Sequence, residues 1–275
     1  MIIETAPAKI NLALHVRARR ADGYHEIETL FAFLRDGDVL TLAPGDVSLT
    51  ITGPFAGDLA PNDDNLVLRA ARAYAAAFGV TASGAFTLDK RLPIASGIGG
   101  GSADAAAALR ALARRDGITP DDRRLFACAG QLGSDVPACL LGVTALGGGR
   151  GELLEPLGGV TGTAVLLVNP GVAVSTAPVF AGWDLVDRGA IPPGNTLGRA
   201  LAGRNDLEKP ALALAPAIAD VLAALHDAGG ATLARMSGSG ATCFALYAND
   251  AARDRAAAAV RAAHPRWWCL ESVLT

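Results

Sequence analysis

The most unusual stretch of the sequence is glycine-rich: residues 92–108 read LPIASGIGGGSADAAAA. Glycine makes up 32 of the 275 residues, well above the usual share of about 7%. The excess gathers at 97–101, 147–151 and 238–240. The first of these clusters follows a predicted strand and precedes an alanine-rich predicted helix. Backbone without β-carbons, next to the free N–H groups of a helix N-terminus, suits a phosphate group.

Two common glycine motifs fail to match this loop. A Walker A motif ends in Gly-Lys and then Ser or Thr, whereas Gly101-Ser102 contains no lysine. A dinucleotide fingerprint needs a third glycine where the chain has Ser102 or, in the other frame, Asp104. Ser102 could cap the helix or offer its hydroxyl to a phosphate or metal, and Asp104 could lie near a magnesium ion. A tight turn with an ordinary cap is the alternative.

A lysine and an aspartate stand in apolar stretches elsewhere. Lys9 lies in PAKINLALHV, where its ammonium needs a partner or a cleft unless it is a solvated strand end. Asp135 lies in GSDVPACLLG and could cap a short helix led by Pro137. If Lys9 and Asp135 met, the lysine would offset developing charge while the carboxylate oriented or deprotonated a hydroxyl, as phosphoryl transfer requires. The sequence alone leaves the pairing open.

Periodicity and turn signals predict the elements that must position these residues. The first 90 residues are rich in predicted strands, apart from a helix over 65–78 with Asp64 or Asn65 as its N-cap. Further helices are predicted over 102–115, 119–132, 210–230 and 250–264. Further strands are predicted over 84–92, 163–174, 232–248 and 267–274, the third of these being two strands about a glycine turn.

The second half has the β-α-β-β-α-β order of a ferredoxin-like domain, and the texture of the sequence changes near 150–160. Residues 187–209 are polar and are predicted to be irregular. Gly238 and Gly240 form either a hairpin turn or a second backbone clamp that faces the first glycine loop. These patterns predict two domains.

Composition narrows the class of protein. The net charge is −3 and no basic stripe is present, which argues against a nucleic-acid partner. The four cysteines form no C-x-x-C pair and lie among apolar residues, which predicts reduced thiols in a core. A leader pattern is absent and no apolar stretch reaches about 18 residues, so we expect a cytoplasmic protein with no membrane partner. The sequence does not indicate an oligomeric state.

Three motifs in this order resemble the superfamily of galactokinase, homoserine kinase, mevalonate kinase and phosphomevalonate kinase. They are the Pro-Ala-Lys strand, the Pro-x-x-x-Gly-Ile-Gly-Gly-Gly-Ser loop and the late Gly-Ser-Gly turn. Within that superfamily the chain is similar, nearly end to end, to the 4-diphosphocytidyl-2-C-methyl-D-erythritol kinase family. The most discriminating stretch is ADGYHEIETLF, which differs from the mevalonate and homoserine kinases.

The resemblance implies an α+β fold with a ribosomal-protein-S5-like N-terminal domain and a ferredoxin-like C-terminal domain. Residues 1–155 would bind ATP, residues 156–275 would bind the substrate, and the active site would lie in the cleft between them. It implies a kinase that uses ATP with Mg²⁺ to phosphorylate the C2 hydroxyl of 4-diphosphocytidyl-2-C-methyl-D-erythritol, in the non-mevalonate route to isoprenoid precursors. A sibling kinase, or a non-catalytic nucleotide- or RNA-binding module, is the alternative.

The resemblance also implies roles for individual residues. Lys9 and Asp135 match the catalytic pair. The ATP phosphate loop matches Pro93, Ile94, Ala95, Ser96, Gly97, Ile98, Gly99, Gly100, Gly101, Ser102 and Ala103. The substrate site matches Asn11 and Thr176 as polar lining, Tyr24 and His25 as the cytidine-reading segment, and Phe180 as the aromatic that stacks on cytosine.

Simpler roles are open for some of these residues: Tyr24 and Phe180 could be core aromatics, and His25 could merely end a strand. Ala95-Ser96 departs from the family pattern, because many members have glycines there. We expect a stiffer start to the loop and intact ATP binding.

Overall fold

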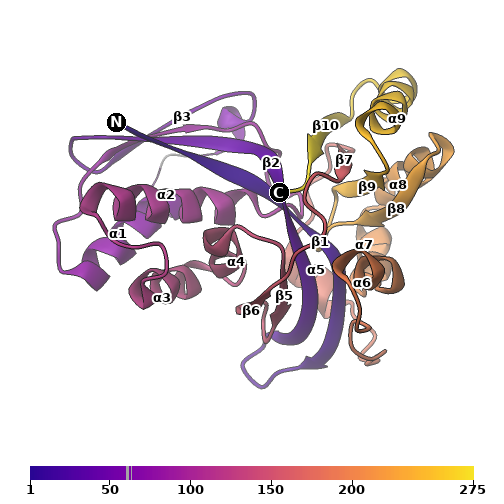
Figure 1. Ribbon diagram of the computed structural model, residues 1–275, viewed down its shortest axis with the longest axis horizontal. Helices are drawn as coiled ribbons and strands as arrows, with labels where there is room; N and C mark the ends of the chain where they lie inside the picture. Colours follow the sequence, from indigo (N-terminus) through magenta and orange to yellow (C-terminus); the bar gives the residue numbers. More distant parts are fainter. Residues whose placement is uncertain (60–61, 63) are drawn as a thin grey trace. The chain divides into compact units, whose positions relative to one another are not determined.

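The computed structural model describes residues 1–59, 62 and 64–275 (Figure 1). The chain folds into two compact units that interleave along the sequence. The first unit comprises Met1–Ala8, Asp36–Ile94 and Gly99–Gly142, and the second comprises Lys9–Arg35, Ala95–Ile98 and Val143–Thr275. Two long paired strands, β1 (Ile2–Arg19) and β2 (His25–Ala43), contribute residues to both units. The sequence predicts a single boundary at residue 155, whereas each of these units is made of separate stretches of the chain. The boundary at 155 therefore stays a prediction.

In its described residues, the first unit combines a small sheet with four helices. The last residues of β2 pair antiparallel with β4 (Ala85–Asp89), and β4 pairs parallel with β3 (Ser48–Thr52). A short 3₁₀ turn spans Ala56–Asp58. The helices pack against one another and are α1 (Leu66–Phe78), α2 (Gly100–Asp116), α3 (Arg123–Leu132) and α4 (Val136–Leu141).

The helix ends of the first unit follow local capping chemistry. Asn65 caps α1 by accepting a hydrogen bond from the N–H of Val67 at 3.0 Å, as one of the two predicted caps. Helix α2 begins two residues earlier than predicted, at Gly100. Helix α3 begins at Arg123 rather than at the predicted Thr-Pro start, because Asp122 supplies the capping oxygen.

The second unit contains the predicted ferredoxin-like domain. Its four antiparallel strands stand in the order β10-β7-β9-β8, which is the order that a β-α-β-β-α-β chain produces. Helices α8 (Ala217–Asp227) and α9 (Asp250–Ala263) contact the sheet. The strands are β7 (Ala164–Asn169), β8 (Ala231–Met236), β9 (Cys243–Tyr247) and β10 (Trp268–Val273).

Two predictions for residues 187–230, which precede β8, were wrong. The long helix expected over 210–230 is two helices, α7 (Glu208–Leu214) and α8, bent by 118° at the break. Pro216 lies in the break and cannot supply the N–H that a continuous helix needs. The segment expected to be irregular contains α6 (Thr196–Ala202), which Asn195 caps. Helix α5 (Thr176–Ala181) precedes this segment.

The rest of the second unit extends the N-terminal strands. Residues 29–31 of β2 pair with β5 (Ala145–Gly148), which pairs with β6 (Leu153–Pro156). All four cysteines are free thiols, as predicted, and three of them are buried. Among the described residues no single helix has the length and apolarity to cross a membrane, although the bent pair α7 and α8 meets that test when the two are joined.

Candidate functional site

The middle of the predicted phosphate loop, residues 95–98, belongs to the second unit, and its backbone carbonyl groups point toward other residues of that unit. All four carbonyl oxygens accept hydrogen bonds there. In order along the loop, the donors are Val174 N, Thr242 N, the Ser237 hydroxyl and Lys9 N, at 3.3, 3.0, 2.9 and 2.9 Å. Because these carbonyls are occupied, their negative ends are kept from an anion bound at the loop.

Gly97 makes the closest approach in this loop. It has φ +77°, and a β-carbon there would lie 2.5 Å from the carbonyl oxygen of Ser237 and 2.7 Å from that of Gly240. These two residues belong to the turn between β8 and β9, which Ser237 N closes onto Thr242 O at 2.9 Å. The late glycine turn is therefore the predicted hairpin, and it also contacts the first loop.

Ala95 shows what the departure from the family pattern does to the backbone. Its φ is +49°, in the left-handed region where a β-carbon costs roughly 1–2 kcal/mol. The loop therefore begins with a residue whose backbone is strained. The expected stiffness at the start of the loop stays a prediction.

The end of the loop starts α2 in the first unit. Gly99 is the N-cap with φ +67° and offers no capping side chain, and Ala103 N makes the first helical bond, to Gly99 O at 2.8 Å. The N–H groups of residues 100–102 therefore point out of the helix end without an intrahelical acceptor. Ser102 lies inside α2, so the predicted capping role was wrong and its hydroxyl stays a candidate ligand.

A buried ion triad holds the two ends of this region. Lys90 Nζ lies 2.5 Å from Asp38 Oδ2 and 2.8 Å from Asp104 Oδ2. Asp38 also accepts the N–H groups of Arg91 and Leu92, directly before the loop. A β-carbon on Gly100, at the start of α2, would lie 3.0 Å from Lys90 Nζ. The triad therefore fixes both the strand end and the helix start.

The charges of this triad are unequal, with two carboxylates to one ammonium. Burial raises the pKa of Asp104 to about 7, Lys90 opposes that rise and Asp38 adds to it. Burial alone would lower the pKa of Lys90, but Asp104 and Asp38 outweigh it and raise the pKa. Asp104 is 3% exposed and is committed to Lys90, which argues against the magnesium role considered above.

Lys9 and Asn11 lie together in the second unit. Lys9 is 3% exposed, so it is not a solvated strand end, and its Nζ donates to Asn11 Oδ1 at 3.0 Å. The Asn11 amide donates in turn to Thr29 Oγ1 at 2.8 Å, and Asn11 N donates to the Ser237 hydroxyl at 3.2 Å. Ser237 thus connects the lysine strand to Gly97.

Asp135 occupies the N-cap position of α4, with Pro137 in the first turn, as the sequence predicts. Its side chain makes no capping hydrogen bond, so capping does not account for it. Asp135 belongs to the first unit and Lys9 to the second. The pairing of Lys9 with Asp135 stays a prediction.

Two of the three predicted cytidine residues, His25 and Phe180, lie in an aromatic cluster in the second unit. The ring centroids of His25 and Phe180 are 5.0 Å apart, and Trp183 meets His25 edge-on at 5.8 Å. Burial, with the nearby charge of Arg19, lowers the pKa of His25. Trp183 was not predicted, although its spacing of three residues from Phe180 at the end of α5 is a usable signal.

The remaining substrate residues are placed differently. Tyr24 is 52% exposed beneath the guanidinium of Arg150, so it is not a core aromatic. Thr176 lies at the start of α5, with its hydroxyl 3.1 Å from that of Ser239. Thr176 therefore lies beside the same hairpin turn that contacts Gly97.

Comparison with known proteins gives the family. Residues 65–143 match the model of the GHMP kinases N terminal domain, and residues 193–266 match GHMP kinases C terminal. The chain is 57% identical to a 4-diphosphocytidyl-2-C-methyl-D-erythritol kinase of Rhizorhabdus wittichii, over 98% of this chain and 94% of that protein. It is 52% identical to one of Methylobacterium radiotolerans, over 100% of this chain and 99% of that protein.

A solved structure agrees. The crystal structure of a 4-(cytidine 5'-diphospho)-2C-methyl-D-erythritol kinase superposes with a TM-score of 0.78 at 36% identity, covering 99% of both chains. A homoserine kinase from Cytophaga hutchinsonii shares the fold alone, with a TM-score of 0.68 at 20% identity, over 98% of this chain and 95% of that one. The chain belongs to the 4-diphosphocytidyl-2-C-methyl-D-erythritol kinase family of the GHMP kinases.

Proposed function

We propose that this chain transfers the γ-phosphoryl group of ATP to the C2 hydroxyl of 4-diphosphocytidyl-2-C-methyl-D-erythritol. The substrate oxygen forms the new P–O bond, the bond from the γ-phosphorus to the bridging oxygen of ADP breaks, and the hydroxyl proton is lost. The observation that carries the proposal is the meeting of three family motifs: Gly97 packs on the turn 237–242, and Lys9 reaches both through Ser237 and Asn11.

ATP is the proposed donor, held by residues 93–103. The residues fit a phosphate chain in two respects: the carbonyls of 95–98 are bonded inward, and the first N–H groups of α2 are not used by the helix. Mg²⁺ would neutralise charge on the phosphates of ATP. The described residues contain no group of three or more His, Cys, Asp or Glu that could hold a metal, so the phosphates themselves would supply most of its ligands.

Lys9 and Asp135 are the proposed catalytic residues. Lys9 is buried, and its ammonium would lie where negative charge grows as the phosphoryl group moves. The Asp135 carboxylate would orient the C2 hydroxyl and accept its proton. Catalysis would come mainly from positioning and charge stabilisation.

The cytidylyl end of the substrate is proposed to bind the aromatic cluster. Phe180 would stack on the cytosine, Tyr24 and His25 would read its edge, and Asn11 and Thr176 would line the polar part of the site. The free thiols, three of them buried, suit a reducing compartment, and we propose the cytoplasm.

The test is a coupled assay of ADP release with Mg²⁺ and ATP, with and without 4-diphosphocytidyl-2-C-methyl-D-erythritol, with mevalonate and homoserine as control substrates. We expect release that depends on the first compound, and a new phosphomonoester on C2 by phosphorus NMR. Turnover of a control substrate instead would identify a sibling activity. ATP binding without any product would identify a binding module.

A further inference from the structure

A loop that follows α5, residues 183–191, is fastened to the two N-terminal strands at three points. We call it the strap. It begins with Trp183, which meets His25 edge-on. Its three fastenings are Asp187 Oδ1 to Arg17 Nε at 2.8 Å, Gly189 O to His15 Nδ1 at 2.9 Å, and Ile191 N to Glu28 Oε2 at 2.6 Å.

His15 is the buried member of these fastenings, with 0% exposure. Its Nδ1 faces the Gly189 carbonyl, which can only accept, so Nδ1 carries the proton. Its Nε2 receives the N–H of Arg204 at 3.1 Å, so Nε2 carries none. The two contacts together require the neutral Nδ1–H tautomer.

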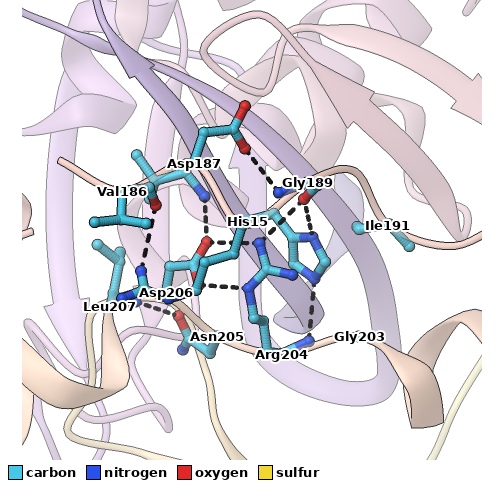
Figure 2. Close-up of polar contacts among 12 residues, drawn as sticks. His15, Val186, Asp187, Gly189, Ile191, Gly203, Arg204, Asn205, Asp206 and Leu207 are labelled. Atoms are coloured by element: carbon cyan, nitrogen blue, oxygen red, sulfur yellow. Dashed lines mark hydrogen bonds and ion pairs between the residues drawn. The ribbon is translucent and has the colours of Figure 1, made fainter. Parts of the chain in front are cut away.

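The second partner of His15 is itself rigidly placed. Arg204 O accepts from Leu14 N at 2.8 Å, and Asp206 N donates to Leu14 O at 2.9 Å, which forms a short parallel bridge to β1. Arg204 Nη2 donates to Gly189 O at 3.0 Å, so this carbonyl receives two donors. Figure 2 shows His15 between the strap and the segment 203–207.

The strap contains local hydrogen bonds, among them Val186 N to Asp184 Oδ1 and Gly189 N to Asp187 Oδ1, and one strained residue. Leu185 has φ +63°, a left-handed conformation that is unfavourable for leucine, and it is 68% exposed. Such a backbone persists when its surroundings impose it. The strap continues directly from Trp183, which is buried in the core and whose backbone N–H donates to Phe180 O at 3.1 Å. Trp183 supports the ring of His25, which lies against Phe180.

We propose that His15 is a positioning residue for the pyrimidine end of the substrate, acting through Gly189 and the strap on the cluster of Trp183, His25 and Phe180. The inference rests on the proposed function, because it assigns this cluster to the cytidylyl group. His15 does not touch the substrate. Its effect is to keep the aromatic surface in one place before the substrate arrives.

The charges around His15 favour the neutral ring overall. Burial lowers its pKa and Arg204 adds to this, against the Gly189 hydrogen bond and the charges of Asp206 and Glu28. The strap contributes Asp187 and β1 contributes Arg17, which are paired with each other. A proton on Nε2 would remove the Arg204 N–H bond and add charge beside a guanidinium. Acid pH is therefore expected to loosen the strap.

The test compares His15→Phe, which keeps a ring without either contact, with His15→Asn, whose amide can still donate to Gly189. We expect His15→Phe to raise the KM for the cytidylyl substrate on the order of tenfold or more, with the KM for ATP changed less than about twofold. His15→Asn should recover much of the loss. Asn249→Ala removes the cap of α9 in the same unit and serves as the control for lost stability.

Two further measurements distinguish an error in the role of His15 from an error in the proposed function. In the wild-type chain, ¹⁵N spectra of the His15 ring should show the Nδ1–H tautomer. The KM for the cytidylyl substrate should rise as acid pH protonates this ring, with a component that His15→Asn removes. A wild-type enzyme that turns over while His15→Phe leaves both KM values unchanged would overturn the inference alone. An Nε2–H tautomer would also overturn it. A wild-type chain without turnover would instead refute the proposed function.

Discussion

At the residue scale, Asp135 stands at the N-cap position of α4, and its side chain makes no capping hydrogen bond to that helix. Asp135→Asn keeps the shape but cannot accept a proton. We expect kcat to fall about 10²–10⁴-fold while ATP still binds, measured by steady-state kinetics and by titration with ATP. Near-normal turnover would remove Asp135 from the mechanism. Asp122→Asn, at the cap of α3, is the matched control and should change helix stability without this loss.

Phe180 offers a ring that is half-buried beside the core and lies against His25. Replacing it with alanine removes the surface on which a base would stack, worth about 1–3 kcal/mol per base. Phe180→Ala should therefore raise the KM for the cytidylyl substrate roughly tenfold and leave the KM for ATP nearly unchanged. Equal effects on both would exclude stacking.

The raised pKa of Asp104 predicts that the free energy of unfolding depends on pH. In the folded chain it keeps its proton up to about pH 7, whereas in the unfolded chain it ionises near 3.8. Between these values the folded state binds more protons, so this group lowers the free energy of unfolding as pH rises. Asp104→Asn should remove that dependence and stabilise the chain most above pH 7. Urea unfolding across this pH range checks it, with the exposed Asp46→Asn as control; an unchanged slope would contradict it.

At the element scale, the phosphate loop and the hairpin turn fit together only because Gly97 has no side chain. Gly97→Ala places a methyl group against backbone oxygens and strains a positive φ. We expect it to lower the free energy of unfolding by more than about 1 kcal/mol and to raise the KM for ATP. Gly158→Ala, where a β-carbon meets nothing within 4 Å, is the control in the same unit. Equal behaviour of the two variants would show that the loop does not need this contact.

Elements with strong local signals could be predicted from the sequence. The cap at Asn65, the hairpin about Gly238 and the ferredoxin-like order all follow from short-range patterns. Pro216 was a signal for a helix break, but the apolar periodicity on both sides of it favoured one continuous helix in the prediction. Helix α6 is only Thr196–Ala202, too short for its cap to stand out in a polar stretch.

The site residues also divide into those that a local motif identifies and those that only the folded structure brings in. Lys9, Asn11 and the loop could be identified because a family motif surrounds each of them. The partners that hold them could not: Ser237 lies 226 residues from Asn11, and Arg204 lies 189 residues from His15. Contacts at such separations depend on the assembled fold, and a lone serine or histidine carries no periodic signal.

At the scale of the whole molecule, the interleaving of the two units predicts that a cut at residue 155 would not yield two folded halves. Residues 156–275 contain the ferredoxin-like sheet but lack Leu14, Val16 and Ile27, which belong to the same buried core. We expect this fragment alone to give poorly dispersed NMR spectra, and to gain dispersion when residues 1–155 are added. A well-dispersed spectrum from the fragment alone would show that the predicted domain boundary is also a folding boundary.

The same interleaving has a consequence for how the chain is made. Residues 9–16 of β1 are buried, yet partners such as Arg204 and Ser237 are synthesised much later, 189 residues after His15 and 226 residues after Asn11 respectively. At about 5–20 residues per second, this apolar stretch waits on the order of ten to forty seconds. During that time it is available to chaperones and to other nascent chains. The strand that carries Lys9 and His15 is therefore synthesised early but gains its last partners late, which leaves it open to misassembly in the cell.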